Sequence, residues 1–181
     1  MVVNGWRLYV HPLFDQQLRR LVEQVEALAA KDPIGFKEQP AAKLLATINR
    51  HIREIIPRDP NAAEFRLGNT LGADNRHWFR AKFHERYRLF YRFSSKERVI
   101  LYAWVNDEKT LRKAGSRTDP YRVFRSMLES GDPPNTMTQL LVRSNELKDA
   151  SLNFSPEPKG ISKAGRVPHA HGPKKTGEPQ R

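Results

Sequence analysis

Apolar residues along the first third of the chain recur at spacings typical of one strand and then of two helices. Residues 6–11, WRLYVH, alternate, which places Trp6, Leu8 and Val10 on one face of a strand. Pro12 then begins a helical pattern that contains Phe14, Leu18, Leu21, Val22, Val25 and Leu28. A second helical stripe ends near Pro57 and contains Leu44, Leu45, Ile48, Ile52 and Ile55. We expect these amphipathic helices to form a hairpin lying on a sheet.

Alternation returns in residues 77–93, HWFRAKFHERYRLFYRF, and predicts two strands joined by a tight turn at residues 84–86. One face of the paired strands is apolar and contains Phe79, Ala81, Phe83, Tyr87, Leu89, Tyr91 and Phe93. The opposite face contains Arg80, Lys82, His84, Arg88, Phe90 and Arg92. We therefore expect a sheet with one apolar face and one cationic face.

The next run, RVILYAWVND at residues 98–107, is apolar on both faces, which is typical of a strand inside a sheet. Strict alternation places Ile100, Tyr102 and Trp104 on the same face of this strand. Further on, Asp119 and Pro120 are suited to cap and begin a helix that ends at Gly131. Its expected buried residues are Val123, Phe124, Met127 and Leu128. A weaker helical pattern follows through Met137, Leu140, Leu141 and Leu147.

These elements predict an α+β fold of order β-α-α-β-β-β-α, with the helical hairpin packed on an antiparallel sheet. We expect one domain over residues 1–150. The character of the chain changes in residues 151–181, where five prolines stand between positions 156 and 181 and apolar periodicity is almost absent. Such a segment buries too little apolar surface to offset chain entropy, so we expect a disordered, basic tail.

The net charge of the chain indicates which kinds of molecule it binds. Lys and Arg number 32 against 20 Asp and Glu, a formal net charge of +12, which favours a polyanion such as nucleic acid or a ribosome, or an acidic protein. The chain has no cysteine, which excludes disulfides and cysteine metal sites. No run approaches the roughly 20 apolar residues of a membrane helix, and no secretory signal pattern begins the chain. We expect a cytoplasmic protein without membrane attachment.

Several segments resemble the RelE superfamily of bacterial toxins, and the likeness is greatest to the YhaV family. They are VNGWRLY.HP.F, AAKLLA, W.R.KF...RYRLFYR, W.NDE.TLR, TD.Y.VF..ML and G.PP, and they extend over about residues 3–134. The resemblance implies a microbial RNase fold, cleavage of mRNA in the ribosomal A site and neutralisation by a PrlF-type antitoxin. It also implies binding of operator DNA by the toxin–antitoxin complex. The charged residues to which the resemblance assigns the phosphate correspond to Arg80, Lys82 and Arg88.

The chemistry of RNA cleavage agrees with that assignment. The 2′-hydroxyl of RNA can attack the adjacent phosphorus, so the protein has to align the groups, stabilise negative charge and move two protons. Arginine is planar, bidentate and permanently charged, which favours Arg80 and Arg88 as the phosphate ligands. Lys82 is a candidate base, because neighbouring guanidinium groups disfavour its charged form. No His, Asp or Glu spacing indicates a metal site, so we expect no metal or cofactor.

Further candidates for binding substrate follow the third strand of this region. Asn106, Lys109 and Arg112 lie in a loop where a sheet presents groups to a cleft, and each could bind a phosphate or the leaving group. Tyr121 is suited to stack on a base, with core packing as the alternative. Arg92 extends the predicted cationic face.

Two other functions fit a cationic sheet face. One is a non-catalytic RNA- or ribosome-binding protein, because charge alone gives affinity without chemistry. The other is an interaction module that receives an acidic segment of a partner, and we expect an antitoxin to dock beside Phe90 and Tyr102. Replacing Arg80 and Arg88 by lysine separates these functions, because binding should survive the change whereas cleavage that needs bidentate geometry should fall.

Overall fold

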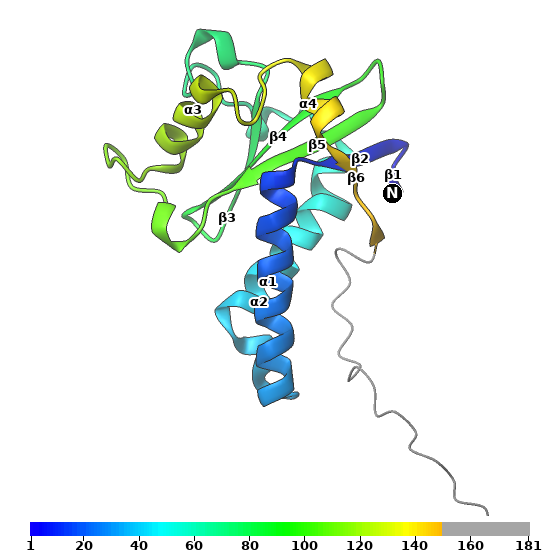
Figure 1. The fold of residues 1–181 in the computed structure, drawn as a ribbon, viewed down its shortest axis with the longest axis vertical. Coiled ribbons are helices and arrows are strands. Elements are labelled where there is room, and N and C mark those ends of the chain that lie inside the picture. Colours follow the sequence, from blue (N-terminus) through cyan, green and yellow to red (C-terminus); the bar gives the residue numbers. More distant parts are fainter. Residues whose placement is uncertain (150–181) are drawn as a thin grey trace, which may run out of the picture.

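A sheet of mixed strand direction lies at the centre of the molecule, as seen in a computed structural model that describes residues 1–149 (Figure 1). Its strands are β1 (Val2–Val3), β2 (Trp6–Val10), β3 (Phe79–Phe83), β4 (Tyr87–Ser94), β5 (Val99–Val105) and β6 (Asn145–Glu146). The order is β1-β2-β5-β4-β3, and β6 also pairs with β2. The α+β class is confirmed. The expected antiparallel sheet is wrong for one pair, because β2 and β5 are parallel and are joined through a long crossover connection.

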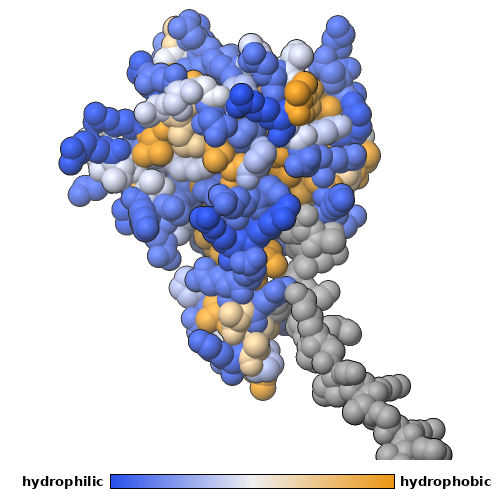
Figure 2. Space-filling model, in the orientation of Figure 1, coloured by the Kyte–Doolittle hydropathy of each residue, from blue (hydrophilic) through white to orange (hydrophobic). Residues whose placement is uncertain are grey.

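The predicted helical hairpin is confirmed. Its first helix is α1 (Pro12–Lys31), and its second is α2 (Pro40–Arg50), which continues through a π turn at His51–Ile55. Both helices begin with proline, whose missing N–H costs nothing at that position. The far end of the hairpin extends beyond the sheet (Figure 1), and Ile34 at its tip is 91% exposed. Figure 2 shows apolar surface at this tip and a mostly hydrophilic surface elsewhere on the same face.

The first hydrophobic cluster fills the space between the hairpin and one face of the sheet. The sheet contributes Leu8, Ala81, Leu89, Tyr91, Ile100 and Tyr102, and the helices contribute Phe14, Leu18, Leu45, Ile48 and Ile52, all of them buried. Two buried hydroxyls find backbone acceptors, Tyr91 on Pro60 at 2.8 Å and Tyr102 on Ile52 at 3.1 Å. This cluster buries one face of β3, β4 and β5.

The opposite face is not purely cationic, contrary to the prediction. Helix α3 (Pro120–Ser130) covers part of it and forms a second cluster, in which Phe124 stacks on Phe90 with ring centroids 4.2 Å apart. Phe90 and Tyr102 are both fully buried, so neither can anchor an antitoxin. Polar side chains on this face include Arg80, Lys82 and Arg88, on the part of β3 and β4 nearest the turn between them.

A β-bulge corrects the face assignment in β5. Between the pairs Phe90–Trp104 and Tyr91–Tyr102, strand β5 has one extra residue, Ala103. The bulge turns Trp104 to the α3 side of the sheet, whereas Tyr102 stays in the cluster beneath the hairpin. Strict alternation had placed both on one face.

The ends of the last helices follow local signals. Asp119 caps α3 through a bond from the Tyr121 N–H, and Gly131 ends the helix with a φ of 82°. Helix α4 (Met137–Arg143) ends before the predicted limit at Leu147, which lies fully buried after the short β6 strand. The predicted disordered tail, residues 151–181, lies outside the described residues. Within residues 1–149, no helix combines the length and apolar character needed to span a membrane.

Candidate active site

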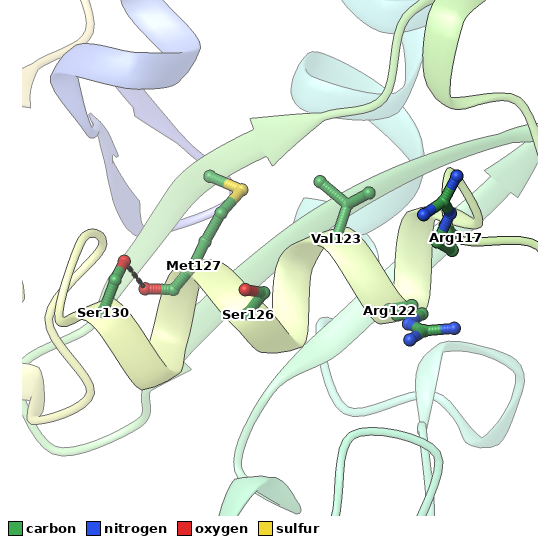
Figure 3. A pocket seen from close by; sticks show the side chains of 6 residues that line it. All are labelled: Arg117, Arg122, Val123, Ser126, Met127 and Ser130. Atoms are coloured by element: carbon green, nitrogen blue, oxygen red, sulfur yellow. Dashed lines mark hydrogen bonds between the residues drawn. The ribbon is translucent and has the colours of Figure 1, made fainter.

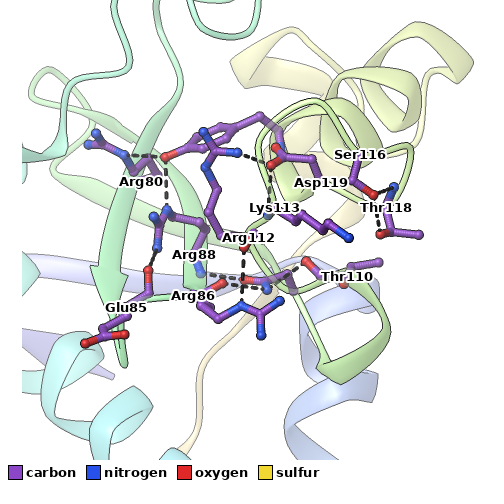
Figure 4. Close-up of polar contacts among 12 residues, drawn as sticks. Arg80, Glu85, Arg86, Arg88, Thr110, Arg112, Lys113, Ser116, Thr118 and Asp119 are labelled. Carbon is purple, nitrogen blue, oxygen red and sulfur yellow. Dashed lines mark hydrogen bonds and ion pairs between the residues drawn. The ribbon is translucent and has the colours of Figure 1, made fainter.

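Two arginines from neighbouring strands meet at one phenolic oxygen. Arg80 lies on β3, Arg88 lies on β4, and the hydroxyl of Tyr121 in the first turn of α3 accepts a hydrogen bond from the Nε atom of each, both at 3.0 Å (Figure 4). The strand register pairs Lys82 with Arg88, which places three cations on one end of this face. Arg80 and Arg88 therefore lie on the same face of adjacent strands, as predicted, and Tyr121 connects them.

Backbone carbonyls fix the two guanidinium groups further. Nη1 of Arg88 donates to the carbonyls of Glu85 at 2.9 Å and Tyr87 at 2.7 Å. Nη1 of Arg80 donates to the carbonyl of Glu64 at 2.6 Å and more weakly, at 3.3 Å, to that of Arg66. The Nη2 atoms of both arginines have no acceptor within residues 1–149, and neither is buried from solvent. Each arginine is thus oriented by its other nitrogens and keeps one free donor.

Burial distinguishes the two arginines. Arg88 is only 7% exposed, whereas Arg80 is intermediate. Arg88 was predicted on a cationic face of the sheet, and it is nevertheless buried, because Tyr121 of α3 and the β3–β4 turn lie against it. A charge held in this way is desolvated and preorganised, and it therefore interacts more strongly with an anion than an exposed side chain does.

Tyr121 is a site residue whose role the sequence did not reveal. Burial acts to raise the pKa of its phenol, but the hydrogen bonds and charges of Arg80 and Arg88 outweigh burial and lower the pKa from its ordinary value. The guanidinium carbons of Arg88 and Arg112 lie 5.8 Å and 5.2 Å from the ring centroid. The ring also meets Phe90 edge-on at 5.8 Å. The hydroxyl of Tyr121 therefore forms hydrogen bonds with the arginines, and its ring packs against Phe90 and the guanidinium groups.

The turn between β3 and β4 places the remaining nearby groups. His84 and Glu85 have φ values of 43° and 55°, a strained conformation for residues other than glycine. This turn directs the Glu85 carbonyl to Arg88 and brings His84 Nε2 within 2.8 Å of the Thr47 hydroxyl on α2. Lys82 is exposed beside the arginines.

Asn106, predicted to bind substrate, uses its side chain to hold the backbone around Arg88. Its side chain is buried, Oδ1 accepts from the backbone N–H of Arg88, and Nδ2 donates to the carbonyls of Arg86 at 3.1 Å and Thr110 at 3.0 Å. All of its polar atoms are therefore used within the protein. Arg112 forms an ion pair with Asp119 and lies at the border of the site, above the Tyr121 ring.

Two other predicted substrate ligands lie elsewhere. Lys109 is exposed at the mouth of a groove between α1 and α2, on the hairpin side of the sheet. Arg92 shares the α3 side with Arg88 but lies 5.6 Å from the Trp78 ring centroid and donates to the Asn135 carbonyl. Burial lowers the pKa of Arg92 to about 10. Neither residue joins the cluster around Tyr121.

Known proteins give an independent indication of activity. Residues 8–145 match the YhaV toxin family, described as a toxin with endonuclease activity, of a toxin–antitoxin system. The chain is 47% identical to toxin YhaV of Escherichia coli O6:H1 (strain CFT073) over 146 residues, which cover 80% of this chain and 95% of that protein. It is 48% identical to ribonuclease toxin YhaV of Escherichia coli (strain K12) over 134 residues, 73% and 87% of the two chains. No solved structure matches the chain, so the RelE-like assignment of the fold stays a prediction.

Proposed function

The chain belongs to the YhaV family, toxins with endonuclease activity that act within toxin–antitoxin systems, and on that premise we propose that it is a ribosome-associated endoribonuclease. In this proposal it cuts mRNA by attack of the RNA 2′-hydroxyl on the adjacent phosphate, needs no metal for this step, and thereby inhibits translation and growth. The observation that supports the proposal is the pair of guanidinium groups held on one phenolic oxygen, each with a free Nη2 donor.

The scissile phosphate binds between the free Nη2 atoms of Arg80 and Arg88. As the 2′-oxygen bonds to phosphorus, negative charge grows on the non-bridging oxygens, and fixed donors stabilise that charge without having to reorganise. Lys82 adds a third positive charge beside the same phosphate. Because Tyr121 and the backbone carbonyls already hold the guanidinium groups, their orientation does not depend on the substrate.

Tyr121 supplies a proton to the leaving group. Its oxygen accepts from both Nε atoms, so its own O–H is free to point towards the phosphate site. The 2′-hydroxyl loses its proton to a base and forms the new P–O bond, the bond from phosphorus to the 5′-oxygen breaks, and that oxygen takes the proton of Tyr121. The products are a 2′,3′-cyclic phosphate and a 5′-hydroxyl. A lowered pKa makes the phenol a stronger acid for this step.

The surface around Arg80 and Arg88 also suggests how partner molecules bind. We propose that a PrlF-type antitoxin neutralises the toxin by placing acidic side chains over the free Nη2 atoms, and that the complex binds operator DNA. Since Phe90 and Tyr102 are buried, these acidic side chains contact Arg80, Lys82 and the free Nη2 atom of Arg88 instead of those two rings. An antitoxin complex that leaves both arginines open to solvent would show neutralisation by another route.

Induction of the protein in cells tests this function. New 5′ ends should appear within translated mRNA, carry a 5′-hydroxyl, and be absent when Arg88 is replaced by lysine. Growth arrest without new 5′ ends would instead support a non-catalytic RNA- or ribosome-binding protein.

A further inference from the structure

A cavity borders Tyr121, and its lining does not include Arg80, Lys82 or Arg88. It has a volume of about 630 Å³ and lies between residues 112–116 and α3. Its lining includes Tyr121, Arg112, Ser116, Arg122 and Arg125. Since the hydroxyl of Tyr121 contacts Arg80 and Arg88 and its side chain also borders this cavity, the cavity begins where the phosphate site ends.

A second hollow continues the first along the outer face of α3 (Figure 3). It has a volume of about 380 Å³ and is lined by Arg117, Arg122, Val123, Ser126, Met127 and Ser130. Arg122 and Ser126 line both spaces and form the ridge between them. In Figure 3, Arg117 lies in the loop before α3 and Arg122 lies in the first turn of the helix. A continuous path therefore leads from Tyr121 over α3.

The cations on this path are not equally available. Arg112 is paired with Asp119, and Arg125 is paired with Glu129 at 3.0 Å. Arg117 and Arg122 are exposed, and neither forms an ion pair or a side-chain hydrogen bond within residues 1–149. Exposed guanidinium groups without acceptors are suited to bind phosphates.

We propose that the RNA strand crosses α3 along this path, an inference that rests on the proposed cleavage at Arg80 and Arg88. The cavity beside Tyr121 receives the nucleotide next to the scissile phosphate, where hydroxyls and a guanidinium group can contact the edges of an unstacked base. Arg122 and Arg117 bind the phosphates that follow. The ligand is single-stranded RNA, since a duplex would present its bases stacked and paired instead of free to enter the cavity.

The test measures how RNA binding depends on salt. A single-stranded oligonucleotide with 2′-O-methyl riboses serves as the probe, because it cannot be cut by its own 2′-oxygen. The slope of log K against log salt is negative, and each lost phosphate contact makes it less negative by about 0.7 for single strands. Replacing both Arg117 and Arg122 by glutamine should therefore make the slope less negative by about 1.4, whereas Arg20→Gln, an exposed change on α1, should leave it unchanged.

A steric variant separates contact from long-range charge. Ser126→Trp removes no charge and leaves helix propensity almost unchanged. The larger side chain would project into the two hollows that Ser126 lines and obstruct the path between them. It should weaken binding of the probe and slow cleavage, with the melting temperature kept. An unchanged slope in the double variant, or no binding by the parent protein, overturns the path. Weakened binding of an acidic antitoxin with an unchanged RNA slope overturns it as well. A parent protein that binds RNA with the expected slope but never cuts it contradicts the proposed function alone.

Discussion

The Nε atom of Arg88 donates a 3.0 Å hydrogen bond to the hydroxyl of Tyr121, which lies 33 residues further along the chain. The same hydroxyl accepts an equal bond from Arg80. One oxygen thus aligns two guanidinium groups from two strands, and the helix that carries it is fixed by the Asp119 cap. The proposed chemistry depends on this arrangement.

Tyr121→Phe keeps the ring and removes the oxygen. We expect cleavage to fall about a hundredfold to a thousandfold, the effect of losing a positioned proton donor or a preorganised contact to transition-state charge. RNA binding should persist, because no positive charge is lost. Single-turnover cleavage, probe binding and a melting curve on the same preparation check this. Cleavage at the parental rate would remove Tyr121 from the mechanism.

The lowered pKa of Tyr121 predicts a pH dependence. The acid works only while protonated, so the rate should fall as pH rises through a pKa below the ordinary value of about 10. The folded state releases this proton before the unfolded state does, so the group's contribution to stability grows as pH rises above its folded pKa and disappears as pH falls below it. Ultraviolet titration of tyrosinate in the parent and Tyr121→Phe proteins locates the transition. No tyrosine ionising below the ordinary range would contradict the site.

Lysine replacements separate charge from geometry. Arg80→Lys and Arg88→Lys keep the positive charge but lose the planar guanidinium and its several hydrogen bonds. RNA binding should therefore be nearly retained, while cleavage drops at least tenfold. Arg88→Lys should also lower stability by roughly 1–3 kcal/mol, because the partly buried carbonyls of Glu85 and Tyr87 lose the guanidinium as their donor.

Leu89→Ala is the matched control for those variants. Leu89 is fully buried beneath the hairpin, so its truncation should cost roughly 2–5 kcal/mol of stability without altering the rate per folded molecule. Chemical denaturation and active-site titration separate the two quantities. If Leu89→Ala and Arg88→Lys behave alike, the loss of cleavage in the arginine variant is a folding effect.

Asn106→Ala tests the structural role of Asn106. Its removal takes the side-chain partner from the Arg88 N–H and from the Thr110 carbonyl, whereas the Arg86 carbonyl keeps the Arg112 N–H, so we expect a loss of roughly 1–3 kcal/mol in unfolding free energy. Lys109→Ala, on the exposed loop nearby, should change stability by less than about 0.5 kcal/mol. Equal melting temperatures for these two variants would show that Asn106 is not a structural support.

Much of the fold could be predicted because its signals are local. Helical spacing located α1 and α2, and the sequence Asp119-Pro120 with Gly131 located α3. The parallel pairing of β2 with β5 joins distant segments, which leave no mark in local patterns. The bulge at Ala103 breaks the period of two on which the face assignment rested, so Trp104 was placed on the wrong side.

The site was predictable only in part, for a related reason. Strand parity brings Arg80, Lys82 and Arg88 to one face, as expected. Parity cannot show that α3 covers that face, so it missed the burial of Arg88 and the hydroxyl of Tyr121 between the arginines. Asn106 follows β5 directly, but only the structure shows that its polar atoms are used by the backbone.

The chemistry of the RNA ends tests the central claim most directly. Free RNA with a known sequence is incubated with a high concentration of purified protein in EDTA, and both new ends of the cut strand are identified. Attack by the 2′-hydroxyl predicts a 2′,3′-cyclic phosphate and a 5′-hydroxyl, with no cut at a site that carries a 2′-deoxyribose. A 5′-phosphate end, or cleavage only when Mg²⁺ is restored, would contradict the account.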